Sequence, residues 1–63
     1  MASIDETEIR FYLEKLNTEQ LTSILEKNGY SYKGSDKVLI TRIMTKISYS
    51  LIIDELENMG VLD

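Results

Sequence analysis

The sequence predicts a small all-α domain of three to four helices with a helix–extended loop–helix core. Apolar residues recur at three- and four-residue spacing along most of the chain. Residues that cap helices stand in front of these segments. Three glycines, and no proline, punctuate the sequence. The length of 63 residues suffices for a single domain, residues 1–63.

A first flanking helix is expected over residues 4–16, from about Ile4 to Leu16. Ser3 and Glu6 have the spacing of a capping box, in which each side chain accepts a hydrogen bond from a backbone N–H of the first turn. One face of this helix is apolar and should be buried: Ile9, Tyr12, Leu13 and Leu16.

A second helix is expected to follow a cap at Asn17 or Thr18 and to run to about Asn28. Asn17 and Gln20 form another possible capping box. Gly29 is placed to end the helix in the left-handed conformation. The expected buried stripe comprises Leu21, Ile24 and Leu25.

An ordered extended loop is expected over Tyr30–Gly34, before a third helix that Ser35 caps. The helical period of this third helix is strong, with apolar residues at Leu39, Ile40, Ile43, Met44 and Ile47. The poor helix formers of Ser48–Ser50 favour a break, followed by a fourth helix over residues 51–59 that Gly60 ends. One continuous helix from Asp36 to Met59 is the competing interpretation.

The stretch Leu16–Ile43 resembles a SAP domain, a small helix–loop–helix family associated with DNA and RNA, with the SAP-like core at about residues 16–47. The residues that match the family pattern are Leu21, Leu25, Gly29, Tyr30, Gly34, Leu39, Ile40, Arg42 and Ile43. The resemblance implies that the loop and the start of the third helix dock on phosphates. It also implies that Tyr30, at a hydrophobic position of the family, packs in the core, while Tyr32 faces outward.

The charge is unevenly distributed. The chain carries a net charge of −4. Residues 27–46 nevertheless carry +4, because this stretch contains five basic residues and a single acidic one, Asp36, and the rest of the chain carries −8. The overall sign disfavours a nonspecific nucleic-acid binder, whereas the basic centre favours phosphate contacts.

The leading hypothesis is therefore weak, non-specific binding of DNA or RNA. Backbone amides at a helix start can hold a phosphate, and a loose stripe of cations along the helix can follow a phosphate backbone. The alternative for these cations is an ordinary solvated face. The candidate residues are Tyr32, Lys33, Gly34, Ser35, Lys37, Arg42 and Lys46.

The second hypothesis is an acidic protein-interaction module, such as a small phage-type regulator or inhibitor of a host protein. The C-terminal segment has more apolar residues than one short helix needs for one buried face, so part of it should cover a partner or a second copy in a homodimer. The candidate residues are Leu51, Ile52, Glu55, Met59 and Leu62.

Catalysis is not expected. The chain has no cysteine and no histidine, which removes the usual ligands of structural zinc and the usual proton shuttles and nucleophiles. We therefore expect no enzyme activity, no catalytic residues, no metal and no cofactor. No apolar run reaches the length of a membrane span, and the acidic start does not resemble a signal peptide, so a cytoplasmic protein is expected.

Overall fold

The computed structural model describes residues 5–62, and within this range the chain folds as an all-helical domain without strands. The expected fold class is therefore confirmed. The helices are α1 (Glu6–Glu14), α2 (Thr18–Lys27), α3 (Asp36–Lys46) and α4 (Tyr49–Asn58). The longest has 11 residues, and no helix of the described range is long and apolar enough to cross a membrane.

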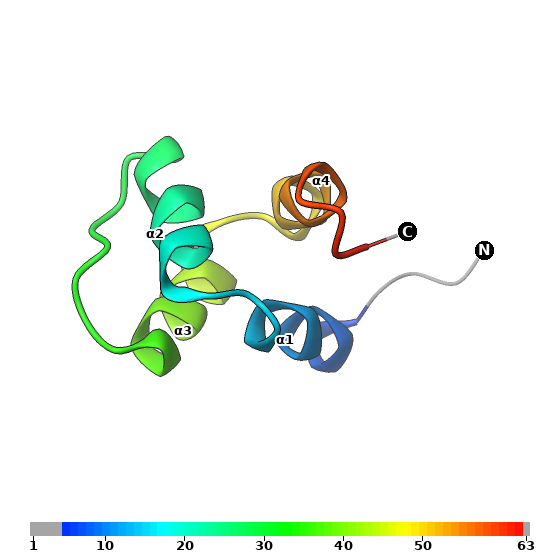
Figure 1. Ribbon diagram of the computed structural model, residues 1–63, viewed down its shortest axis with the longest axis horizontal. Coiled ribbons are helices and arrows are strands. Elements are labelled where there is room, and N and C mark those ends of the chain that lie inside the picture. Colours follow the sequence, from blue (N-terminus) through cyan, green and yellow to red (C-terminus); the bar gives the residue numbers. More distant parts are fainter. Residues whose placement is uncertain (1–4, 63) are drawn as a thin grey trace.

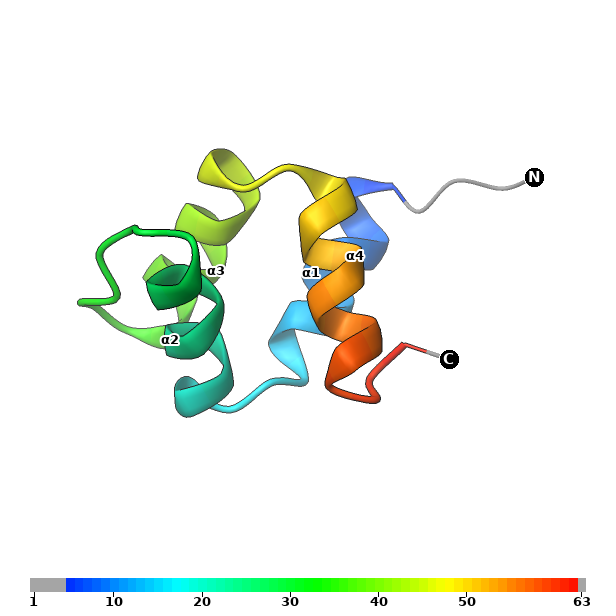
Figure 2. The ribbon, with the colours of Figure 1, turned by 90° about the horizontal axis from the view of Figure 1, so that it is seen from above.

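The helices form two pairs that lie side by side. Helix α2 packs on α3, α1 packs on α4, and α1 also contacts α3, so that α1 and α3 join the two pairs. Figures 1 and 2 show the α2–α3 pair at one end of the molecule and the α1–α4 pair at the other. The loop between α2 and α3 arcs over the outer side of its pair, away from α1 and α4.

The start of α1 differs from the expectation. Asp5 is the N-cap, and its side chain accepts a hydrogen bond of 2.9 Å from the backbone N–H of Glu8. The helix therefore begins at Glu6 rather than Ile4. An aspartate caps as well as a serine, and only the geometry of the entering chain decides which residue does so. The expected cap Ser3 lies outside the described residues.

Two of the other three helix starts follow the sequence closely. Asn17 and Gln20 form a complete capping box, with hydrogen bonds of 2.8 and 3.0 Å, and Ser35 caps α3 with an extended backbone. The break between α3 and α4 is confirmed, which rules out one continuous helix, but α4 begins at Tyr49 rather than Leu51. Ser48 caps it, so that Tyr49 and Ser50, expected in the break, belong to the helix.

Helices α2 and α4 end in the same motif. Gly29 has φ +79°, and the N–H of the next residue, Tyr30, returns to the carbonyl of Leu25 at 2.9 Å. At the end of α4, Gly60 has φ +76°, and the N–H of the next residue returns to the helix in the same way. This is the Schellman motif, whose left-handed residue is most often glycine. Gly29 therefore fixes where the loop leaves α2.

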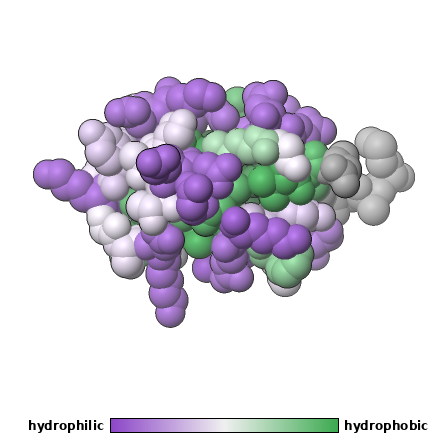
Figure 3. Space-filling view, viewed as in Figure 1, coloured by the Kyte–Doolittle hydropathy of each residue, from purple (hydrophilic) through white to green (hydrophobic). Residues whose placement is uncertain are grey.

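A single apolar core joins all four helices. Its buried residues are Ile9, Leu13, Leu16, Leu21, Ile24, Leu25, Leu39, Ile40, Ile43, Ile47, Ile52 and Leu56, with Tyr12, Met44, Met59, Val61 and Leu62 packed partly buried against them. In Figure 3, apolar surface gathers between α1 and α4, whereas the end that carries α2 and the loop is mostly hydrophilic. A polar surface at that end is the natural place for a polar ligand.

Candidate nucleic-acid interface

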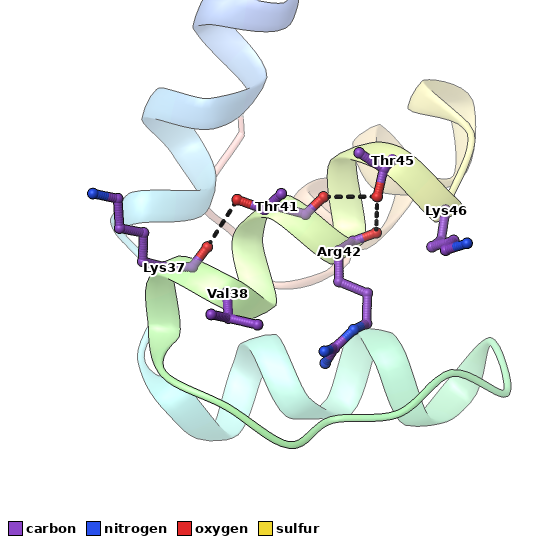
Figure 4. Close-up of a pocket in the computed structure, with 6 residues that line it drawn as sticks. All are labelled: Lys37, Val38, Thr41, Arg42, Thr45 and Lys46. Carbon is purple, nitrogen blue, oxygen red and sulfur yellow. Dashed lines mark hydrogen bonds between the residues drawn. The ribbon is translucent and has the colours of Figure 1, made fainter.

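Arg42 holds the loop against α3. Its guanidinium Nη1 donates hydrogen bonds to the carbonyl oxygens of Ser31 and Lys33, both at 2.9 Å. Figure 4 shows the side chain reaching from α3 toward the loop, away from the direction of Lys37 and Lys46. The sequence predicted Arg42 as a phosphate contact. In the structure it is partly buried, and it also acts as a positioning residue, because its Nη1 is directed at two backbone carbonyls.

A shallow groove of about 330 Å³ runs along the outward face of α3. Its lining residues are Lys37, Val38, Thr41, Arg42, Thr45 and Lys46 (Figure 4). The hydroxyl of Thr41 donates to the carbonyl of Lys37 at 3.0 Å, and that of Thr45 donates to the carbonyl of Thr41 at 3.0 Å. Because these hydroxyl protons are used within the helix, the groups left to donate to a ligand are the lysine ammonium groups and the N–H groups of Arg42 other than those on Nη1.

The carboxylate of Asp36 lies to one side of this groove. It accepts a hydrogen bond of 2.6 Å from the hydroxyl of Thr18 at the start of α2. Asp36 lines a second groove of about 310 Å³, together with Arg10 and Glu14 of α1 and with Lys37, which borders both grooves. The negative charge at the start of α3 is therefore directed toward α1 and α2, and the groove on the outward face of α3 contains no carboxylate.

Gly34 and Ser35 shape the turn into α3. Gly34 has φ +126°, and a Cβ on it would lie 2.9 Å from Cγ1 of Val38. Ser35 accepts a long hydrogen bond of 3.4 Å from the N–H of Val38, which satisfies one donor of the first turn. Both residues therefore have structural roles that account for their identity without a ligand.

The two tyrosines of the loop are both on the surface. Tyr32 is 47% exposed, as expected, but Tyr30 is 39% exposed and lies outside the core. The expectation that Tyr30 is a core residue is wrong. The Schellman motif directs its backbone N–H back to α2, whereas the loop then turns outward, so the side chain stays at the protein surface.

The lysines of the interface have no carboxylate partner in the described part of the chain. The one ion pair between residues 5 and 62 joins Lys27 to Glu55 at 3.2 Å, between the end of α2 and α4. Lys33, Lys37 and Lys46 are all exposed. Their ammonium groups remain available to an anionic ligand.

The residues expected to contact a protein partner are mostly committed to the fold. Ile52 is fully buried, and Met59 and Leu62 pack partly buried on the core. The carboxylate of Glu55 pairs with Lys27. Leu51, at 48% exposed, is the member of this set with a prominent apolar surface. The prediction is wrong for Ile52, because the apolar surplus at the C-terminus serves α1 as well as α4.

Sequence reasoning missed three residues that line the groove, namely Val38, Thr41 and Thr45. The signal was present, because Thr41 and Thr45 lie three and seven positions after Val38 and four and eight after Lys37, which is the spacing of residues on one side of a helix. The two carbonyls held by Arg42 carried no sequence signal at all. Within residues 5–62, no group of three or more carboxylates is placed to hold a metal ion.

Comparison of the chain with protein-family models, curated proteins and solved structures found no match. The likeness to SAP domains therefore rests on the residues quoted above, and the site must be judged by its own chemistry.

Proposed function

We propose that this domain is a non-enzymatic nucleic-acid-binding module that contacts phosphates through the α2–α3 loop and the outward face of α3. One observation carries the proposal: the groove on α3 is lined by Lys37, Arg42 and Lys46 and by no carboxylate. Lys33 adds a fourth cation from the loop. In a chain with net charge −4, such a concentration of positive charge on one face favours a polyanion.

The spacing of the cations suits an extended ligand. Lys37 and Lys46 stand nine positions apart, near the two ends of α3, which separates them by about 13.5 Å along the helix axis at a rise of 1.5 Å per residue. Nine residues make about two and a half turns, so the two lysines lie on opposite edges of the groove. A phosphate backbone that crosses the groove diagonally meets a cation at each end. The resemblance to SAP domains supports the same orientation, with the loop and helix start toward the nucleic acid.

Arg42 and Gly34 have structural roles in this surface. Arg42 holds the carbonyls of Ser31 and Lys33, so the position of the backbone that carries the Lys33 side chain depends on it. Gly34, with φ +126°, lets the chain turn directly into α3. Both residues organise the surface that the lysines use.

The test is a binding titration of labelled DNA and RNA at several salt concentrations, followed by fluorescence anisotropy. We expect weak binding that falls steeply between roughly 50 and 200 mM salt, because each phosphate contact releases counterions. Alanine at Lys33, Lys37 or Lys46 should each reduce the slope of log K against log salt by about 0.7 to 0.9.

Lys15→Ala is the matched control, because it removes one positive charge from α1, where the ammonium lies 4.5 Å from the centre of the Phe11 ring. It should leave the salt slope unchanged. Absence of binding to DNA and RNA even in low salt would reject the proposal, and so would an equal effect of Lys15→Ala and Lys37→Ala.

A further inference from the structure

The loop between α2 and α3 presents two tyrosine side chains that the fold does not cover. Tyr30 and Tyr32 are 39% and 47% exposed. The close aromatic pair found between residues 5 and 62 is Phe11 with Tyr12, on α1, so neither loop tyrosine stacks on another ring of the described chain. Their ring surfaces are available to a ligand.

The backbone that carries these tyrosines is held at both ends. The N–H of Tyr30 donates to the carbonyl of Leu25, which ties the first residue of the loop to α2. Arg42 holds the carbonyls of Ser31 and Lys33 and so ties the other end to α3. A ligand that uses the rings therefore finds them already positioned, which lowers the entropy cost of binding.

The Arg42 contacts also orient the loop backbone. One nitrogen of Arg42 reaches the carbonyls of both Ser31 and Lys33, so these two oxygens converge on α3. Tyr30 and Tyr32 remain exposed on the same held segment, with one residue between them. Each ring is therefore a separate surface on which a base can stack.

From this geometry we infer that the loop binds unpaired bases, with Tyr30 and Tyr32 as stacking platforms, so that the domain prefers single-stranded nucleic acid over a duplex. The inference rests on the proposed function, because the lysines supply the phosphate contacts. Stacking on tyrosine needs an open base face, and a duplex buries both faces of its internal bases against their neighbours. Lys33, next to Tyr32, is placed to contact the phosphate of a stacked nucleotide.

The experiment measures binding of the full chain, at low salt, to oligo(dT), oligo(U) and a mixed-sequence DNA duplex, each about 12 nucleotides or base pairs long. We expect either single strand to bind more tightly than the duplex. Tyr30→Ala and Tyr32→Ala should each weaken single-strand binding by about tenfold and leave duplex binding unchanged. The two single-stranded probes offer similar base faces for stacking. A difference in their affinities therefore reports a preference for DNA or for RNA.

Three controls make the result specific. Tyr30→Phe and Tyr32→Phe keep the ring and should retain single-strand binding, which separates stacking from hydrogen bonding by the hydroxyl. Phe11→Ala removes an aromatic ring that is 55% exposed on α1 and should have no effect. Thermal unfolding followed by circular dichroism identifies any variant that fails to fold. If an alanine variant fails to fold, single-strand and duplex binding are compared with the phenylalanine variants instead.

Equal or tighter binding to the duplex, with no effect of the tyrosine variants, would overturn the inference and leave the proposed function intact. No binding to any probe would overturn both. Loss of single-strand binding in the phenylalanine variants would also overturn the stacking inference, because such a loss would assign the contact to the tyrosine hydroxyl groups.

Discussion

At the scale of single residues, Gly34 and Arg42 decide the form of the candidate interface. Gly34 has a backbone conformation that side chains rarely adopt, and Arg42 directs its Nη1 to two carbonyls of the loop. In such a small domain, a residue can therefore serve the shape of a site beside, or instead of, touching what the site binds.

Gly34→Ala should be more destabilising than Gly29→Ala, although both glycines have positive φ. Each substitution carries a conformational cost of about 1–2 kcal/mol. Only at Gly34 does the new Cβ also meet another atom, Cγ1 of Val38 at 2.9 Å, whereas nothing lies within 4 Å at Gly29. Urea unfolding measures the difference in the free energy of unfolding.

The substitution Val38→Ala, alone and combined with Gly34→Ala, is the control for this prediction. Val38 is 44% exposed, so its truncation alone should change stability by less than about 0.5 kcal/mol. The double variant Gly34→Ala with Val38→Ala should regain part of the stability lost to the clash, because Cγ1 is removed while Cβ of residue 38, 3.2 Å from the new Cβ, remains. A double variant no more stable than Gly34→Ala would show that the contact with Val38 is not the cause.

At the scale of elements, the break between α3 and α4 determines the fold, because it allows α4 to turn back and pack on α1. Ile47 adopts an extended conformation with ψ +136°, and Ser48 then caps α4. The sequence contained this signal in its run of poor helix formers. Ile47 stays buried in the core while the chain changes direction, and this burial favours a break between α3 and α4 over one continuous helix.

Ser48→Ala should lower the free energy of unfolding by about 1 kcal/mol, because it removes the oxygen that accepts from the N–H of Leu51. Ser50→Ala is the matched control, since Ser50 is exposed and lies inside the first turn of α4. It should change stability by less than about 0.5 kcal/mol. Chemical denaturation of both variants checks the prediction, and equal losses would contradict it.

At the scale of the whole molecule, a domain of 63 residues has little stability in reserve. Its core depends on contacts between the α2–α3 and α1–α4 pairs. Ile52, fully buried on α4, contributes to that core, whereas Leu51 beside it is 48% exposed. Substituting each of these two neighbours therefore shows which face of α4 contributes to the free energy of unfolding.

Ile52→Ala should cost about 2–5 kcal/mol and bring the domain close to unfolding, whereas Leu51→Ala should cost less than about 0.5 kcal/mol. Thermal melts followed by circular dichroism compare the two. If Leu51→Ala were as destabilising as Ile52→Ala, the packing of α4 described above would be wrong.

Much of this fold was predictable because local signals agree with one another. The capping box at Asn17, the glycine at position 29 and the cap at Ser35 each depend on residues within five positions of one another. The exposure of Tyr30 and the role of Arg42 were not predictable in the same way. Both depend on where the loop passes relative to α3, which is a contact between residues up to eleven positions apart.

The way in which Arg42 holds its loop has a consequence for variation. It donates hydrogen bonds to backbone oxygens, which every amino acid possesses, and it does not contact the loop through hydrogen bonds to the side chains of Ser31 or Lys33. The stretch between the two glycines can therefore be rewritten while its path is preserved, provided the new residues accept an extended backbone. If the proposed function holds, exchanging a few neighbouring side chains of the loop would change what the domain binds without changing its scaffold.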